Sequence, residues 1–229
     1  MFETLLSLDM TPFALSFKLA LITTLILFVI ALPLAWWLSQ TTSKVKPYFE
    51  TLTALPIVLP PSVLGFYILF ALSQNSPLGA FFEESFGIKL VFNFTGLVIA
   101  SCFYSLPFMV QPLQSGFEAL NKNMIEASYI CGKSKTQTLL FVALPNAKAA
   151  LISALVITFA HTVGEFGVVL MVGGSIPGET KVASVAIYEA VEIMNYTQAH
   201  IYSAIMVVLS FLTLLGVYLI NGRMKRVGV

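Results

Sequence analysis

Charged residues are scarce in this 229-residue chain. Lysine and arginine number 12 and aspartate and glutamate 11, so that only 10% of the residues carry a charge, whereas soluble domains carry about 25%. Hydrophobic residues make up 58% of the chain, and its mean hydropathy is +0.90. A globule of this size cannot hide so much apolar surface from water, and we therefore predict a membrane protein whose outer surface is covered by lipid.

Several functional motifs are also missing. Nothing resembles GxxxxGK[ST], so we expect no phosphate-binding loop and no ATP or other cofactor in this chain. A net charge of +1 provides no basic field for nucleic acid. The two cysteines, Cys102 and Cys131, lie in segments of different character, which disfavours a mutual disulfide. With only two histidines and no nucleophile elbow, we expect neither a metal site nor catalytic residues.

Five apolar segments reach the length of about 20 residues that a membrane span needs. They lie at about 19–38, 52–72, 91–110, 149–172 and 201–220. We therefore predict one all-α polytopic membrane domain over residues 1–229. The stretches 78–82 and 182–194 are too short to span, and Glu189 and Glu192 make the second an expected amphipathic helix at the outer interface.

The distribution of charge between the loops predicts the orientation, because cytoplasmic loops are rich in Lys and Arg. One set of segments holds nine cations, namely Lys44, Lys46, Lys122, Lys133, Lys135, Lys148, Arg223, Lys225 and Arg226, and the opposite set holds three, Lys18, Lys89 and Lys181. The acids Glu3, Asp9, Glu83, Glu84, Glu179, Glu189 and Glu192 gather with the smaller set. We expect an external N-terminus and a cytoplasmic C-terminus.

Three prolines crowd the beginning of the second span, in the run LPIVLPPSVLG that contains Pro56, Pro60 and Pro61. Each proline removes a helical hydrogen bond, and inside a bilayer the freed carbonyls need protein or water as partners. One interpretation is irregular backbone that lines a protein interface or a water-filled path. The other is that the prolines only begin the helix near the cytoplasmic interface.

The fourth span carries ionisable side chains, His161 and Glu165, one turn apart on one predicted helical face. Insertion of such a group costs about 3 kcal/mol, so both are expected to face the interior of a bundle. Glu165 is then either neutral or hydrogen-bonded to loosened backbone near Gly164, or in contact with the transported substrate, and as metal ligands the two are too few. The candidates for the pathway or a dimer interface are Ser62, Thr158, His161, Thr162, Gly164, Glu165 and Gly167.

The third loop, 114–148, is the longest segment on the positive side. Leu120, Met124, Ala127 and Cys131 follow helical spacing along one side, Gly132 can stop that helix, and Ser134 can cap a second short helix. Pro145 is expected to end the unit before the fourth span. Such an amphipathic helix either inserts into a groove on a soluble partner or rests on lipid.

The spacing within this loop carries a resemblance to a known family. Glu126 and Ala127, then Gly132, then Leu144 and Pro145 resemble the EAA motif of ABC-importer permeases, with Ser128 in place of the usual second alanine. The runs LPIVLPPSVLGFYIL, GEFGVV and SIPGET are similar to those of molybdate-transport permeases.

This resemblance implies the type I ABC-importer permease fold and import of molybdate by ATP-driven alternating access. It also implies a homodimer in the cytoplasmic (inner) membrane of a prokaryote, with two ATP-binding subunits that hold ATP and Mg, and an external molybdate-binding protein. The loop with Glu126 to Pro145 then forms the coupling site. Pro177, Gly178 and Glu179 are candidate contacts of the binding protein, although they also suit a plain loop.

Alternative functions remain open at the level of sequence. Tungstate, sulfate or another tetrahedral anion can replace molybdate, because these anions share charge and nearly share radius. A secondary transporter is disfavoured, since the chain shows no inverted repeat. A membrane enzyme is the remaining class.

Overall fold

The computed structural model describes residues 9–226, and the side chains of these residues apart from 217 and 220–226. Glu3 and the C-terminal residues 227–229 lie outside the described residues. Every regular element in the described part is helical: α2 (Thr11–Gln40), α3 (Lys46–Val58), α4 (Pro61–Leu72), α5 (Pro77–Phe86), α6 (Phe94–Glu118), α7 (Lys122–Ile130), α8 (Lys135–Thr138), the π-helix η1 (Leu139–Ala143), α9 (Leu144–Asn146), α10 (Lys148–Val163), α11 (Gly167–Gly173), α12 (Ala183–Glu192) and α13 (Tyr196–Arg226). The predicted all-α class is confirmed.

The core lies between α2, α6 and α10, which pack against one another along their lengths. Leu27, Leu38, Met109 and Leu113 are almost completely buried in this core. Trp36 of α2 meets Phe117 of α6 edge to face, with ring centroids 5.3 Å apart. In contrast, only 11% of the apolar stretch of α13 is buried, against 50% for α2 and α6, so α13 offers most of its surface to lipid or to another chain.

Three helices are long and apolar enough to cross a membrane alone, over Thr11–Gln40, Phe94–Glu118 and Tyr196–Gly216, and two bent pairs raise the number to five if each pair is one span. The first predicted span lies within α2, the third begins three residues before α6, and the fifth lies within α13. The other two ranges are not single helices. Range 52–72 divides into α3 and α4, and range 149–172 divides into α10 and α11.

The break between α3 and α4 follows from two consecutive prolines. A residue before proline is disfavoured in the α conformation, and both Leu59 and Pro60 take an extended ψ of 136°. The two helices meet at 111°. Pro56, in contrast, lies inside α3, whose helix continues to Val58. The prolines therefore do more than begin a helix, and the irregular backbone is confined to two residues.

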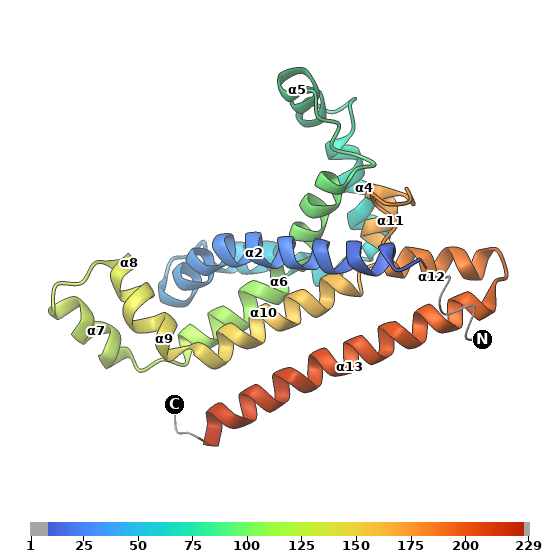
Figure 1. Ribbon diagram of the computed structural model, residues 1–229. Helices are drawn as coiled ribbons and strands as arrows, with labels where there is room; N and C mark the ends of the chain where they lie inside the picture. Colours follow the sequence, from blue (N-terminus) through green and yellow to red (C-terminus); the bar gives the residue numbers. More distant parts are fainter. Residues whose placement is uncertain (1–8, 227–229) are drawn as a thin grey trace.

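The arrangement of the helices separates two ends of the molecule (Figure 1). Helices α7, α8 and α9 lie beyond one end of α2 and α10, and α12 lies at the other end. The predicted amphipathic segment 182–194 contains α12, whose buried side is formed by Ala183, Val185, Ala186 and Ala190. Helix α5, reached through α4, projects to one side with α11 near its base. The Lys-rich loop thus lies at one end, and α12, with Glu189 and Glu192, lies at the other.

Candidate coupling and translocation sites

Two glycines set the contact between α4 and α11. A Cβ atom added to Gly167 would lie 2.8 Å from Cβ of Pro61, and one added to Gly65 would lie 2.8 Å from Cβ of Met171. Because Pro61 and Gly65 of one helix face Gly167 and Met171 of the other in the same order, the two helices run parallel. Small residues allow such close approach. The breaks that begin α4 and α11 therefore lie side by side, with Ser62 exposed in the first turn of α4.

Two polar side chains of the fourth predicted span, His161 and Thr162, form a chain of hydrogen bonds with Ser105 of α6. The Thr162 hydroxyl donates to the Thr158 carbonyl at 2.9 Å, so its oxygen accepts from Ser105, which lies 2.9 Å away. The hydroxyl hydrogen of Ser105 is used in that hydrogen bond, so the Ser105 oxygen must accept a second one from Nδ1–H of His161 at 3.0 Å. A neutral ring with its hydrogen on Nδ1 presents Nε2 as an acceptor, which offers no hydrogen bond to an oxyanion.

Aromatic rings also hold His161 in place. Its ring stacks on Phe108 at 3.9 Å between centroids and lies 4.8 Å from that of Tyr104. Both aromatic residues come from α6, as does Ser105. The half-buried histidine therefore connects α10 with α6 one turn before the break, and side chains of α6 fix the orientation of its ring.

Glu165 lies in the break between α10 and α11, two residues beyond the end of α10. It is only 4% exposed, and none of the described residues lies within hydrogen-bonding distance of its two carboxylate oxygens, although the Ser101 side chain of α6 is near them. The predicted placement of Glu165 on one helix with His161 is wrong, because the helix ends at Val163. The alternative of a carboxylate hydrogen-bonded to loosened backbone near Gly164 is not found among the described residues either. Instead, the backbone carbonyl of Glu165 accepts from Ser184 of α12 at 2.6 Å.

The remaining pathway candidates differ in exposure. Thr158 is fully buried, and none of the described residues pairs with its hydroxyl oxygen. Gly164 is exposed. The buried hydroxyls and Glu165 thus lie inside the bundle, whereas Ser62 and Gly164 mark the open side of the two breaks.

The outer loop that follows α11 has a fixed base and an exposed tip. The Thr180 hydroxyl donates to the Gly173 carbonyl at 2.7 Å and accepts from the Ile176 amide at 2.9 Å. Pro177, Gly178 and Glu179 are exposed above this base, and Gly178 has a φ of 78°. The three binding-protein candidates therefore form one compact projection.

At the opposite end, α7 and α8 form a hairpin whose turn was predicted correctly. Gly132 has a φ of 79°, its amide donates to Tyr129 at 2.9 Å, and the next amide donates to Ser128 at 3.2 Å. These two bonds are the Schellman motif that ends helices at glycine. Ser134 caps α8 through a reciprocal capping box with Gln137, which confirms its predicted role. The helical unit ends at Asn146, one residue after Pro145.

Ser128 joins the two arms of this hairpin. Its hydroxyl lies 2.8 Å from that of Thr138, and both side chains are buried. Neither a second alanine nor any other apolar residue at this position can make that bond. The departure from the usual motif therefore has a local structural reason that depends on the identity of residue 138.

The buried side of α7 differs from the predicted one. Ile125 and Ser128 are buried, whereas Ala127 and Cys131 are exposed. Ile130 is 87% exposed. The predicted row from Leu120 to Cys131 thus does not pack inward as a unit, and Ile130 leaves apolar surface of the hairpin exposed.

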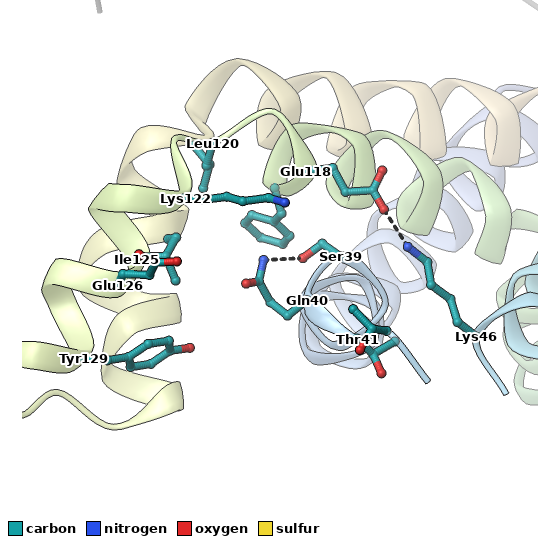
Figure 2. A pocket seen from close by; sticks show the side chains of 12 residues that line it. Ser39, Gln40, Thr41, Lys46, Glu118, Leu120, Lys122, Ile125, Glu126 and Tyr129 are labelled. Carbon is teal, nitrogen blue, oxygen red and sulfur yellow. Dashed lines mark hydrogen bonds and ion pairs between the residues drawn. The ribbon is translucent and has the colours of Figure 1, made fainter. Parts of the chain in front are cut away.

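Glu126 faces a hollow of about 620 Å³ between α7 and the ends of α2, α3 and α6. Figure 2 shows Glu126, Lys122 and Tyr129 on one side of this hollow and the end of α2 on the other. Lys46 Nζ pairs with Glu118 at 3.0 Å at its edge. Leu144 is half-buried and Pro145 exposed. The motif residues therefore lie on the hairpin and on α9, which follows it, and differ in exposure.

Ser105 and Thr138 complete the two hydroxyl pairs and were not among the residues predicted from the sequence. The pairs Ser105–Thr162 and Ser128–Thr138 are tertiary contacts, 57 and 10 residues apart in sequence. The spacing of Ser101 and Ser105, one turn apart in an apolar helix, is the signal that could have drawn attention to α6. No comparable signal marks Thr138.

The family model described as binding-protein-dependent transport system inner membrane component matches residues 20–226. The molybdenum transport system permease protein ModB of Azotobacter vinelandii is 45% identical over 92% of this chain and 93% of its own length. The sulfate transport system permease protein CysT of Synechocystis is 31% identical over 92% of this chain and 75% of its own.

A solved structure shares the fold over almost its whole length. The MetNI methionine ABC transporter, in inward facing conformations, superposes with a TM-score of 0.74 at 18% identity. The match covers 97% of this chain and 99% of the transporter chain. At that identity the likeness concerns the fold alone.

Proposed function

Because this chain belongs to the family of binding-protein-dependent transport system inner membrane components, we propose that it is the permease subunit of an ABC importer that carries molybdate across the cytoplasmic membrane. The observation that carries the proposal is the 45% identity to a molybdenum permease over nearly the full length of both chains. The sulfate permease is more distant at 31%. Tungstate and sulfate remain the competing substrates.

The proposed assembly contains two copies of this chain, two ATP-binding subunits and an external molybdate-binding protein. A second copy is needed because five spans give too small a wall for a path, and because the open side of the two breaks, at Ser62 and Gly164, is exposed in the single chain. The ATP-binding subunits hold ATP and Mg, and this chain contributes no catalytic residue.

The hairpin of α7 and α8 is the proposed coupling site. Its turn is fixed by Gly132, its arms are joined by Ser128 and Thr138, and its exposed side carries Ile130. A rigid, partly apolar projection transmits a push from a soluble subunit better than a loose loop does, since none of the movement is absorbed within it. The compact projection at Pro177 to Glu179, at the other end, is the proposed contact of the binding protein.

The proposed passage is weakly binding. None of the described residues 149–172 is a Lys or Arg, and the hydroxyls of Thr162 and Ser105 are engaged with each other. Selection of the anion is therefore assigned to the external binding protein. A submicromolar affinity of the isolated permease for molybdate would contradict this division of labour.

Uptake in cells tests the substrate assignment. Cells that lack their own molybdate permease are supplied with this chain, its ATP-binding subunit and its binding protein, and uptake of labelled molybdate is measured against excess tungstate and excess sulfate. We expect uptake that sulfate does not reduce. Uptake of labelled sulfate with no uptake of molybdate would contradict the assignment.

A further inference from the structure

An apolar groove lies on the side of the molecule formed by α4, α5 and the first half of α6. It has a volume of about 420 Å³, and all of its lining residues are hydrophobic, Tyr67, Ala71, Leu72, Leu78, Phe82 and Phe103 among them. In an aqueous surface such a groove would be costly. In a chain that spans a membrane, the hydrocarbon of a lipid can fill such a groove.

A second hollow, of about 510 Å³, adjoins the groove and is lined by polar side chains together with Val91 and Phe92. Ser73, Gln74, Asn75, Lys89 and Asn93 line it. At two places along the chain, consecutive residues line one hollow and then the other. Leu72 lines the groove and Ser73 the polar hollow, and Leu90 lines the groove while Lys89 and Val91 line the polar hollow.

Lys89 and Asn75 are the polar groups of this hollow that are left for a ligand. Asn93 already caps α6 through the Gly96 amide at 2.8 Å. Gln74 donates to Glu83 at 3.0 Å, and Ser73 donates to the Phe70 carbonyl at 2.9 Å. The ion pairs among the described residues do not include Lys89. Glu84 on α5 is exposed, and Glu83 is directed to Gln74.

Helix α5, beside the groove, carries a cluster of aromatic rings, two of them exposed. Its rings Phe81, Phe82 and Phe86 contact one another at 5.7 to 6.3 Å. Phe81 is 57% exposed and Phe86 62% exposed. Exposed aromatic rings beside acidic and basic side chains are typical of helices that lie at the boundary between head groups and hydrocarbon.

We propose that this double hollow is a binding site for a phospholipid of the outer leaflet with an anionic head group. One acyl chain occupies the apolar groove, and the phosphate lies in the polar hollow against Lys89 and Asn75. A free oxyanion uses the polar hollow alone and gains nothing from the groove. The site does not depend on which anion the importer carries.

Native mass spectrometry of the purified complex of this chain with its ATP-binding subunit tests the site. Bound phosphatidylglycerol is titrated against the wild type, Lys89→Gln and Ala71→Trp, the last of which fills the groove. Lys18→Gln is the matched control, since it removes an exposed cation of the same predicted side that lines neither hollow. We expect affinity to fall about fivefold in Lys89→Gln, the contribution of one Lys near an anionic surface, to be lost in Ala71→Trp and to be unchanged in Lys18→Gln.

Further arms separate the possible occupants. Soluble glycerol phosphate and molybdate are expected not to displace the lipid, because neither fills the groove. Wild-type affinity in Lys89→Gln overturns the proposal, whatever the folding state of Ala71→Trp. Displacement of the lipid by molybdate, or efficient cross-linking of Tyr67→Cys to its copy in a second chain, overturns it as well. Molybdate uptake by the same variants is scored separately, so that a failure of the lipid site and a failure of the transport assignment are distinguishable.

Discussion

At the scale of single residues, Gly167 fixes the distance between the two helices that begin at the breaks. Any side chain there meets Pro61 at 2.8 Å, and a proline ring in the first turn of α4 has little freedom to move away. Glycine at this position is therefore required by the close approach of Pro61 and not by a left-handed backbone conformation.

Replacement of Gly167 by Ala is expected to destabilise the protein by about 1–3 kcal/mol, the usual cost of overpacking. The measurement is thermal unfolding of the purified chain together with substrate uptake. Gly216→Ala is the matched control, since nothing lies within 4 Å of a Cβ added to that helical glycine. Equal stability of the two variants would contradict the proposed close contact.

Ser128 and Thr138 form the other residue-scale contact with a sharp consequence. Ser128→Ala creates the usual form of the motif but leaves the buried hydroxyl of Thr138 without its partner, at an expected cost of about 1–3 kcal/mol. The double variant Ser128→Ala with Thr138→Val removes both polar groups and is expected to recover most of this loss.

Hydrogen exchange in residues 122–146 measures the stability of the hairpin in each variant. The interaction energy between the two positions is obtained from the double-mutant cycle. Additive effects of the two substitutions would show that the hydroxyls do not stabilise the hairpin together.

At the scale of elements, the loop between α11 and α12 is tied to α12 by a carboxylate. Glu189 accepts from Lys181 and from Ser175. Partial burial raises the pKa of the Glu189 carboxyl, but these two hydrogen bonds and the charge of Lys181 outweigh it and hold the pKa below its usual value of 4.5. The tie is therefore at full strength above about pH 4.5 and weakens as the pH falls through the lowered pKa.

A spin label on Gly178→Cys reports this tie. We expect an immobilised label from pH 7 to about pH 5 and increasing mobility below about pH 4.5. Glu189→Gln is expected to mobilise the label at every pH, whereas Glu192→Gln, on the same helix, leaves it immobilised. A label whose mobility is independent of both pH and Glu189 would contradict the tie.

The elements also show what sequence can and cannot predict. Gly132 and Ser134 were placed correctly because a Schellman turn and a capping box depend on residues a few positions apart. The division of range 52–72 is local too, since the pair Pro60–Pro61 is sufficient to break a helix. The division at Gly164 to Phe166 carries no proline, and the packing of α11 against α4 beyond it is a tertiary contact that the sequence does not show.

Burial of side chains was harder to predict than the helices themselves. Periodicity gave a row from Leu120 to Cys131 on α7, but the buried residues are Ile125 and Ser128, because the hairpin folds back through Thr138. The same limit applies to Glu165, whose surroundings come from α6 and α12.

At the scale of the whole molecule, the two projections lie at opposite ends of one helical core. The hairpin with Gly132 extends from one end, and the loop with Gly178 lies near α12 at the other (Figure 1). Between them, α2, α6 and α10 form a continuous packed unit. Movement imposed on the hairpin can therefore reach the breaks of α4 and α11 through contacts of packed helices, which is the mechanical requirement for alternating access.

Transport by reconstituted vesicles tests most directly whether this chain is the permease of an ATP-driven molybdate importer. The permease, the ATP-binding subunit and the molybdate-binding protein are reconstituted so that ATP faces the coupling hairpin, and accumulation of labelled molybdate is measured with each component omitted in turn. We expect accumulation against the gradient only when all three proteins and ATP are present. ATP-independent accumulation by vesicles that contain this chain alone would contradict it.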